Sequence, residues 1–170
     1  LGIVHYKNSK LVQARDYFLK CIPYLERIGD QEQLKHIYYK IGRTSYDRGN
    51  YSIALKYFLL SLQVSEELGD SVGISDGYHR IAKVYESQKD MEQAVSYNRK
   101  ALAIREAINF KAGIAASCVN LGLVLFSMNR FDDAFLYAKR ALALRMEKTN
   151  EKNHAEPFEL LGKIHNQRGD

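Results

Sequence analysis

The chain has 170 residues, of which 46% are hydrophobic and 26% are charged, and its formal net charge is +5. This balance excludes a disordered chain, and no run approaches the ~20 apolar residues that a transmembrane helix needs. Two cysteines are too few for a disulfide framework. Cys21 and Cys118 both fall on apolar stripes, so we interpret both as small core residues.

The sequence repeats with a period of 40 residues, without any insertion or deletion. Equivalent positions carry alanine (Ala14, Ala54, Ala94, Ala134) and, three residues later, tyrosine (Tyr17, Tyr57, Tyr97, Tyr137). An internal period of this size is typical of solenoid proteins. We therefore predict one array with repeats 1–40, 41–80, 81–120 and 121–160 and a partial repeat 161–170, and we expect it to be a segment of a longer protein.

Each period contains two helical patterns. The second pattern spans residues 11–28, 51–68, 91–108 and 131–148. The first places apolar residues on one face, as at Ile74, Tyr78, Ile81 and Tyr85, with the spacing of a buried helix stripe. Residues 1–7 would form only the end of such a first helix. The connections of about three residues force consecutive helices to lie antiparallel.

Turn and cap residues mark the predicted helix ends. Gly29 and Gly69 follow second helices, where glycine readily takes the left-handed conformation. Asp90 and Gln93 have the spacing of a capping box at the start of another second helix. Asn50 is interpreted as a helix cap at the equivalent position.

Prolines and glycines add two further predictions. Pro23 lies inside a second helix, so we expect a kink or break there, whereas Pro157 predicts a last helix that starts late, with the proline in its first turn. Gly42 and Gly122 mark places where helix backbones approach too closely for a longer side chain.

The recurring columns resemble the tetratricopeptide repeat. They are Ile-Gly or Leu-Gly, an aromatic residue three further on, Gly-Asn or Gly-Asp at the turn, and then alanine, an aromatic and a small residue. The period resembles the 40-residue variant of that repeat. The resemblance implies an all-α fold, a right-handed superhelical solenoid of antiparallel helix hairpins. It also implies that peptides or protein segments bind in a concave groove, and it does not imply catalysis.

In this family the first helices line the groove. The residues carried over by position are Tyr39, Arg43, Tyr46, His79, Arg80, Lys83, Val119, Asn120, Leu123 and Phe126, with His36 and Asp76 beside them. Arg43 and Lys83 lie one period apart and would form a basic ladder next to an apolar patch on the fourth first-type helix. Such a groove suits an extended partner with acidic and hydrophobic residues.

Two alternatives remain open for these residues. Arg43 and Lys83 could form a solvated face paired with Asp47, Asp76 and Glu86. The apolar patch could pack against another segment of the same protein or against a second copy. The rival to a binding groove is therefore an architectural spacer or a homodimer surface.

Reactive chemistry is not indicated. The sequence has no Gly-rich phosphate loop, no paired-cysteine motif and no His-Glu-x-x-His, and its five histidines lack metal-ligand spacing. We therefore expect no enzyme activity, cofactor or metal, and neither nucleic-acid binding nor membrane insertion. The expected function is a non-catalytic protein-binding or peptide-binding module, the docking or sensory input region of a larger protein such as a bacterial signalling or transcription regulator.

Overall fold

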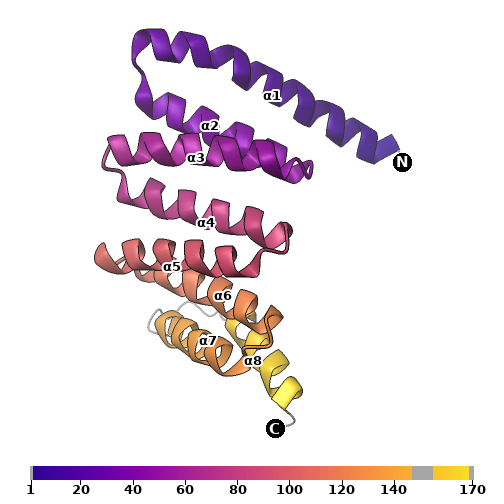
Figure 1. The fold of residues 1–170 in the computed structure, drawn as a ribbon, viewed down its shortest axis with the longest axis vertical. Helices are drawn as coiled ribbons and strands as arrows, with labels where there is room; N and C mark the ends of the chain where they lie inside the picture. Colours follow the sequence, from indigo (N-terminus) through magenta and orange to yellow (C-terminus); the bar gives the residue numbers. More distant parts are fainter. Residues whose placement is uncertain (1, 147–154, 169–170) are drawn as a thin grey trace.

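The computed structural model describes residues 2–146 and 155–168. In chain order its helices are α1 (Gly2–Ile28), α2 (Gln31–Asp47), α3 (Tyr51–Glu67), α4 (Ser71–Ser87), α5 (Met91–Ala107), α6 (Lys111–Ser127), α7 (Phe131–Met146) and α8 (Ala155–Arg168). The described ranges contain no strand. The helices stack on one another from the N-terminal to the C-terminal end (Figure 1), which confirms the predicted all-α solenoid.

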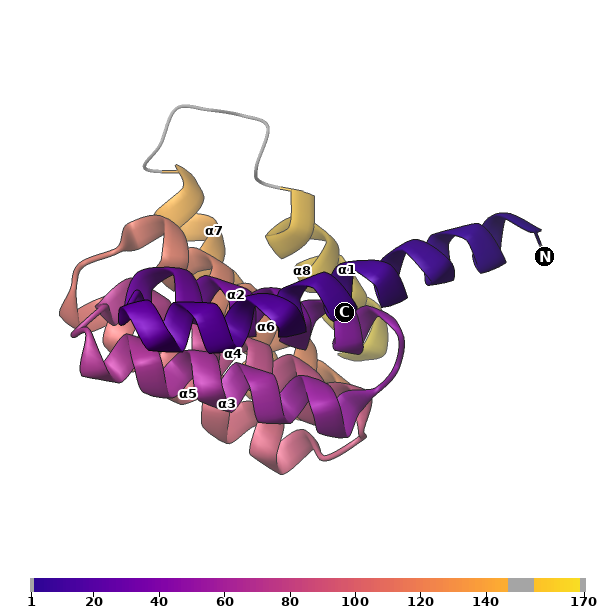
Figure 2. The same ribbon diagram turned by 90° about the horizontal axis from the view of Figure 1, so that it is seen from above.

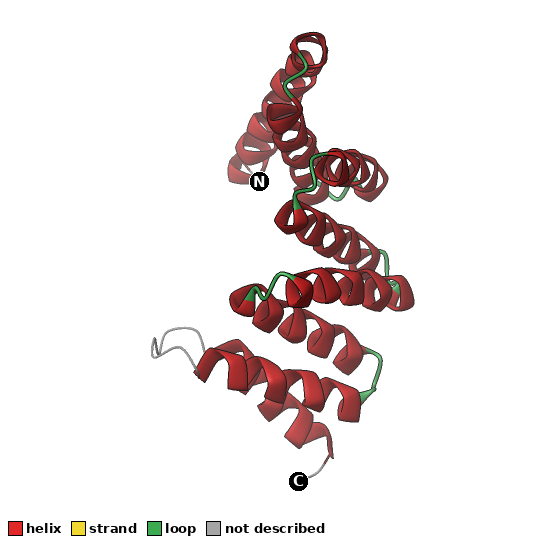
Figure 3. Cartoon of the chain, turned by 90° about the vertical axis from the view of Figure 1, so that its left-hand side faces the viewer, coloured by secondary structure: helices red, strands yellow, loops and turns green. Residues whose placement is uncertain are grey.

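The helices alternate between two types. We call α2, α4, α6 and α8 the A helices, and α1, α3, α5 and α7 the B helices. The pairs α2–α3, α4–α5 and α6–α7 form antiparallel hairpins and make the most extensive helix contacts of the chain. Helix direction changes from one end of the stack to the other (Figure 3), as expected of a superhelical array.

Residues with a left-handed backbone conformation recur every 20 residues along the chain. They are Gly29, Gly49, Gly69, Lys89, Asn109 and Asn129, with φ between 51° and 76°. The predicted glycine turns are therefore confirmed. At the last three turns Lys89, Asn109 and Asn129 take the same backbone conformation, which is unfavourable for residues other than glycine.

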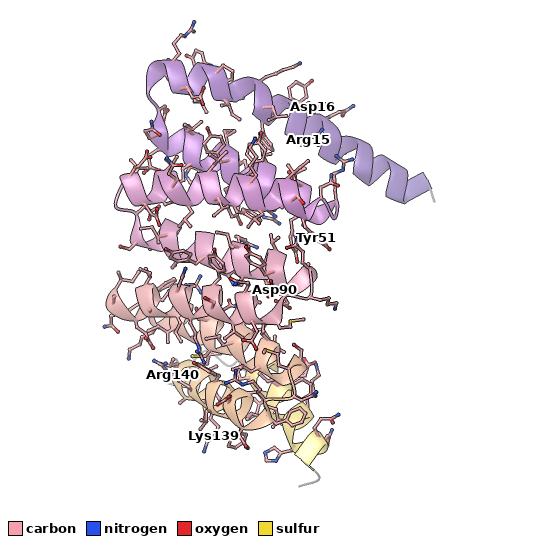
Figure 4. The ribbon with its side chains drawn as sticks, in the orientation of Figure 1. Arg15, Asp16, Tyr51, Asp90, Lys139 and Arg140 are labelled. Atoms are coloured by element: carbon pink, nitrogen blue, oxygen red, sulfur yellow. The ribbon has the colours of Figure 1, made fainter. Side chains whose placement is uncertain are left out.

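Aspartates cap three of the helices. Asp90 Oδ1 accepts a hydrogen bond from the backbone N–H of Gln93 at 3.2 Å, and Asp30 and Asp70 cap α2 and α4 in the same way. Asn50 occupies the equivalent position, but its side chain makes no capping bond. Asn50 is thus the N-cap residue of α3, as predicted, although its side chain does not contribute to the cap. In Figure 4, Asp90 and the first residue of α3, Tyr51, mark the same edge of the stack.

The N-terminal helix departs from the prediction. A turn was expected between residues 7 and 11, yet α1 is one continuous helix, and Pro23 does not interrupt it. Residues 8–10 read Asn-Ser-Lys and contain no glycine, but the turns at 89, 109 and 129 also form without one. The difference here is that the seven preceding residues are too few for a separate stable helix. Pro23 and Leu19 are both exposed, so water can reach the carbonyl that the proline leaves unpaired. The first part of α1 extends beyond the stack (Figure 2).

The core lies between the two helices of each hairpin and also between adjacent hairpins, as where α3 packs on α4. Ala54, Ala94 and Ala134 are fully buried there, whereas Tyr17 on α1 is 69% exposed. Cys118 is buried as predicted, but Cys21 is exposed, so its interpretation as a core residue was wrong. The reason is that no A helix covers this face of α1 in the described part of the chain.

Two glycines set the spacing of the helices, as predicted. A Cβ at Gly42 would lie 2.7 Å from Phe58 Cδ1, and one at Gly122 would lie 2.7 Å from Leu160 Cδ2. Helix α8 begins at Ala155 and holds Pro157 in its first turn, which also matches the prediction. The predicted end of the preceding helix, residues 147 and 148, lies outside the described residues.

Candidate functional site

The A helices carry all ten predicted groove residues. We call the face of these helices that bears them the A-helix surface. On it Arg43 and Leu123 are exposed and Val119 is buried. Half-buried side chains make up the rest: Tyr39, Tyr46, His79, Arg80, Lys83, Asn120 and Phe126. The surface therefore combines partly accessible aromatic, cationic and amide groups, which is the composition of a polar binding surface with apolar anchors.

Three predicted cations meet in one place, which we call the basic pocket. It has a volume of about 210 Å³ and is lined by Arg43, Tyr46, Asp47, Phe58, Arg80 and Lys83. Lys83 Nζ lies 2.8 Å from Glu86 Oε2, and Arg43 Nε lies 4.0 Å from Asp47 Oδ2. Both cations thus have local carboxylate partners, as one of the alternatives supposed. These pairs are partly or largely exposed, so they cost little to rearrange.

Arg80 is oriented by an aromatic ring. Its guanidinium carbon lies 5.4 Å from the ring centroid of Tyr39 on the neighbouring A helix. A cation over an aromatic face is attracted by the ring quadrupole. This contact ties α4 to α2 and holds one wall of the basic pocket.

A polar cluster lies at the centre of the A-helix surface. His79 Nδ1 is 3.5 Å from both Asn98 Oδ1 on α5 and Asn120 Nδ2 on α6. One tautomer of His79 donates to Asn98 and the other accepts from Asn120, so a single state satisfies one of the two bonds. Asn98 is 1% exposed, and its Nδ2 has no partner.

Burial controls the charge of this cluster. Burial, together with the nearby Arg80 and Arg105 guanidinium groups, lowers the pKa of His79 from 6.5 to about 4. His79 is therefore neutral at pH 7. The prediction did not include Asn98, although the sequence signal is a polar residue in a column where Phe18 and Phe58 are aromatic.

The apolar part of the surface is smaller than predicted. Val119 is 4% exposed and belongs to the core, and Phe126 packs on Phe131 with ring centroids 5.4 Å apart. Leu123 remains 41% exposed. A pocket of about 400 Å³ opens here, lined by Ala116, Val119, Asn120, Leu123, Glu156, Glu159, Leu160 and Lys163. We call it the apolar pocket after Val119, Leu123 and Leu160, although half of its lining residues are polar or charged.

A buried arginine that the prediction did not include supports the surface from behind. Arg105 is 5% exposed and donates hydrogen bonds to Ser75 Oγ, Ser117 Oγ and the Gly113 carbonyl. It also donates to Asp76 Oδ1 at 2.7 Å. Asp76 is therefore held by Arg105 and not by Lys83 or Arg43. A charged contact between two B helices joins Arg140 on α7 to Glu106 on α5. Arg140 and its neighbour Lys139 are labelled in Figure 4.

Two findings bear on other kinds of site. Within residues 2–146 and 155–168, no group of three or more His, Cys, Asp or Glu side chains could hold a metal ion. No helix among those described is long and apolar enough to cross a membrane.

The profile of the tetratricopeptide repeat family matches residues 36–107 and 73–147, which together cover more than half of the chain. The chain belongs to the tetratricopeptide repeat family. Tetratricopeptide repeats are in general non-catalytic modules for protein interaction, and stacked repeats of this kind create extended binding surfaces. No curated protein sequence matches the chain.

Solved structures share the fold of this tetratricopeptide repeat array at low sequence identity. BtubC (BKLC) from P. vanneervenii is 21% identical with a TM-score of 0.86, and the match covers 100% of this chain and 71% of that one. Aspartyl phosphate phosphatase F from Bacillus subtilis is 21% identical with a TM-score of 0.85, covering 97% and 44%. A signal transduction ATPase with a tetratricopeptide repeat sensor from Pyrococcus horikoshii is 20% identical with a TM-score of 0.78, covering 93% and 24%.

Proposed function

We propose that this array is a non-catalytic module that binds an extended peptide or protein segment along its A-helix surface. The observation that carries the proposal is the basic pocket, where the cations Arg43, Arg80 and Lys83 from two helices outnumber the two carboxylates paired with them, Asp47 and Glu86. An acidic side chain of the partner fits there, because charge-assisted hydrogen bonds to guanidinium and ammonium groups are the strong ones.

The neighbouring groups support an extended ligand. His79 and Asn120 are half-buried, and between them they offer donors and acceptors to a peptide backbone. Beyond them, the apolar pocket with Leu123 accepts a hydrophobic side chain. Glu156 and Glu159 stand at its rim and disfavour acidic residues there. The ligand is thereby oriented, with its acidic part over α2 and α4 and its hydrophobic part over α6.

We further propose that the array serves as the docking or sensory input region of a larger signalling or regulatory protein. The Pyrococcus horikoshii protein is described as having a tetratricopeptide repeat sensor, and the present chain corresponds to 24% of its length. That description supports an input role for an array of this fold beside other domains.

A charge-reversal experiment tests the proposal. The probe is a fluorescein-labelled peptide that alternates Asp and Leu, and a Lys/Leu peptide is its matched control. In the triple variant Arg43→Glu, Arg80→Glu and Lys83→Glu, binding of the Asp/Leu peptide should weaken at least about tenfold, which corresponds to about 1.4 kcal/mol.

The matched control reverses three exposed lysines on B helices, Lys56→Glu, Lys100→Glu and Lys139→Glu. It changes the net charge by the same amount and should leave the affinity within about twofold, well under the tenfold step of 1.4 kcal/mol. Equal losses in the two variants would show that the peptide responds to net charge and not to the basic pocket.

A further inference from the structure

Ser65 on α3 and Arg105 on α5 stand at the same position of successive repeats. The Arg105 side chain occupies the space between α5 and the two A helices α4 and α6. It reaches the four residues with which it forms hydrogen bonds, Ser75, Asp76, Gly113 and Ser117. Ser65 is also buried, with 1% exposure, but its side chain is far shorter.

The equivalents of those four partners, one period earlier, are Lys35, His36, Gly73 and Gly77. All four line a single pocket of about 260 Å³, together with Ser65 itself, Tyr39, Phe58, Ser61, Asp70, Val72 and Asp76. We call it the Ser65 pocket. It is the volume that an arginine side chain fills in the next repeat and that a serine leaves open here.

The Ser65 pocket belongs to the A-helix surface. Three of its lining residues, His36, Tyr39 and Asp76, stand at positions predicted to border the groove. Phe58 forms a wall of both this pocket and the basic pocket, so the two are neighbours. A ligand that lies along the A-helix surface therefore passes both.

The charged groups of this pocket are already paired. Lys35 Nζ lies 2.8 Å from both Asp70 Oδ2 and Glu32 Oε2, and Asp76 is held by Arg105. The backbone N–H of Gly73 and the ammonium of Lys35 lower the pKa of Asp70. Asp70 is therefore a carboxylate that already has hydrogen-bond partners within the protein.

The serine hydroxyl groups are satisfied as well. Ser61 Oγ donates to the Lys35 carbonyl, and Ser65 Oγ donates to the Ser61 carbonyl. In the described ranges the buried side-chain N and O atoms without a partner are Arg15 Nε, Ser45 Oγ and Asn98 Nδ2, and these residues do not line the pocket. Apart from His36 and the Tyr39 hydroxyl, the polar side chains that line the pocket are thus engaged within the protein, whereas Phe58, the Tyr39 ring and Val72 offer apolar contact.

We propose that the Ser65 pocket receives one apolar side chain, aromatic or branched aliphatic, of the segment bound along the A-helix surface. This inference rests on the proposed function and adds a specificity pocket to it. The size is sufficient, since a cavity of about 150 Å³ holds benzene. The bound segment then carries a hydrophobic residue next to the acidic residue that enters the basic pocket.

Disulfide capture tests this proposal without any peptide. The variant Ser65→Cys is made together with Cys21→Ser, which removes the exposed native thiol. Three small disulfides of similar length are offered, with a benzyl, a guanidinoethyl or a carboxyethyl group. The quantity measured is the concentration of reductant that releases half of each adduct, by mass spectrometry of the intact protein.

The benzyl adduct at position 65 should resist at least about fivefold more reductant than the other two, a difference of about 1 kcal/mol. In the matched control Ser96→Cys, an exposed serine of α5, the three adducts should be released alike. Equal or better retention of a charged adduct at position 65, or no reaction there, would overturn the proposal.

If Ser65→Cys does not fold, Val72→Cys gives the same test, since Val72 lines the pocket and is 48% exposed. The result is independent of the charge-reversal experiment. If the benzyl adduct is retained but the charge-reversal variant still binds the peptide, the Ser65 pocket is supported and the basic pocket is refuted as a binding site. The converse pattern would leave peptide binding standing without this specificity pocket.

Discussion

Gly42 on α2 lies directly against the ring of Phe58 on α3, where a Cβ atom would come within 2.7 Å of Cδ1 and 2.8 Å of Cε1. Phe58 is 2% exposed and forms a wall of both the Ser65 pocket and the basic pocket. The contact between these two residues therefore fixes the spacing of the hairpin and the shape of the candidate site at once.

Replacing Gly42 by alanine should lower the free energy of unfolding by about 1–3 kcal/mol, because a buried ring cannot move aside without strain elsewhere. The matched control is Gly162→Ala on α8, where a Cβ would meet no atom within 4 Å. There the better helix propensity of alanine should leave stability unchanged or raise it by up to about 1 kcal/mol. Urea unfolding measures both, and equal effects would contradict the close contact.

Lys89 should be a site where glycine stabilises the protein. Its φ is 66°, a conformation that costs a residue with a Cβ about 1–2 kcal/mol. Part of this gain is offset, since glycine adds freedom to the unfolded chain. Lys89→Gly should therefore raise the free energy of unfolding by about 0.5–1 kcal/mol. Lys100→Gly, inside α5, should lower it by about 1 kcal/mol, and a loss at both positions would refute the expectation.

Stability should fall as the pH drops below about 6.5, because the pKa of His79 is lowered to about 4 in the folded protein. Between these values the unfolded chain binds a proton that the folded protein does not. The contribution of neutral His79 to the free energy of unfolding is thus fully present above pH 6.5 and is lost as the pH falls to 4. It amounts to about 2–3 kcal/mol.

The variant His79→Gln should show a smaller decrease in the free energy of unfolding between pH 7 and pH 4.5 than the parent protein. His36→Gln, at an exposed position on α2, is the control and should leave the decrease unchanged. Urea titrations at several pH values measure it. An unchanged slope in His79→Gln would show that His79 does not titrate as stated.

Arg105 and Asp76 form one ion pair but should respond differently to substitution. The Arg105 side chain is 6% exposed and that of Asp76 is 55% exposed. Arg105→Met leaves two buried hydroxyl groups and a carbonyl without their donor, and should cost about 1–3 kcal/mol. Asp76→Asn keeps an acceptor at the rim and should cost less than about 1 kcal/mol. Equal costs in thermal or urea unfolding would contradict this division.

The arrangement of hairpins could be predicted from the sequence because each turn repeats its own local chemistry. Glycine at 29, 49 and 69 takes the left-handed conformation, and an aspartate cap follows at Asp30 and Asp70. The same reasoning failed at residues 8–10, because the seven residues before them are too few for a separate stable helix and continue α1 instead. The exposure of Cys21 was also missed, because burial depends on a covering helix and not on the apolar stripe alone.

The positions of the candidate site on the A helices could be predicted as well, since they follow from the period. The partners could not, because they depend on packing between repeats. One alternative paired Asp76 with Arg43 or Lys83 across the surface, but Asp76 binds Arg105 from behind. Val119 was expected on the open face, but it is 4% exposed and belongs to the core where α8 packs against α6.

Photo-crosslinking tests the central claim most directly. The Asp/Leu peptide is given a benzophenone at one position, irradiated with the array, and the attachment sites are mapped by mass spectrometry. If the A-helix surface is the binding surface, the attachment sites fall on α2, α4 and α6, around Arg43, Lys83 and Leu123. Attachment on the outer faces of α3, α5 and α7, or on the open face of α1 around Tyr17, would contradict it.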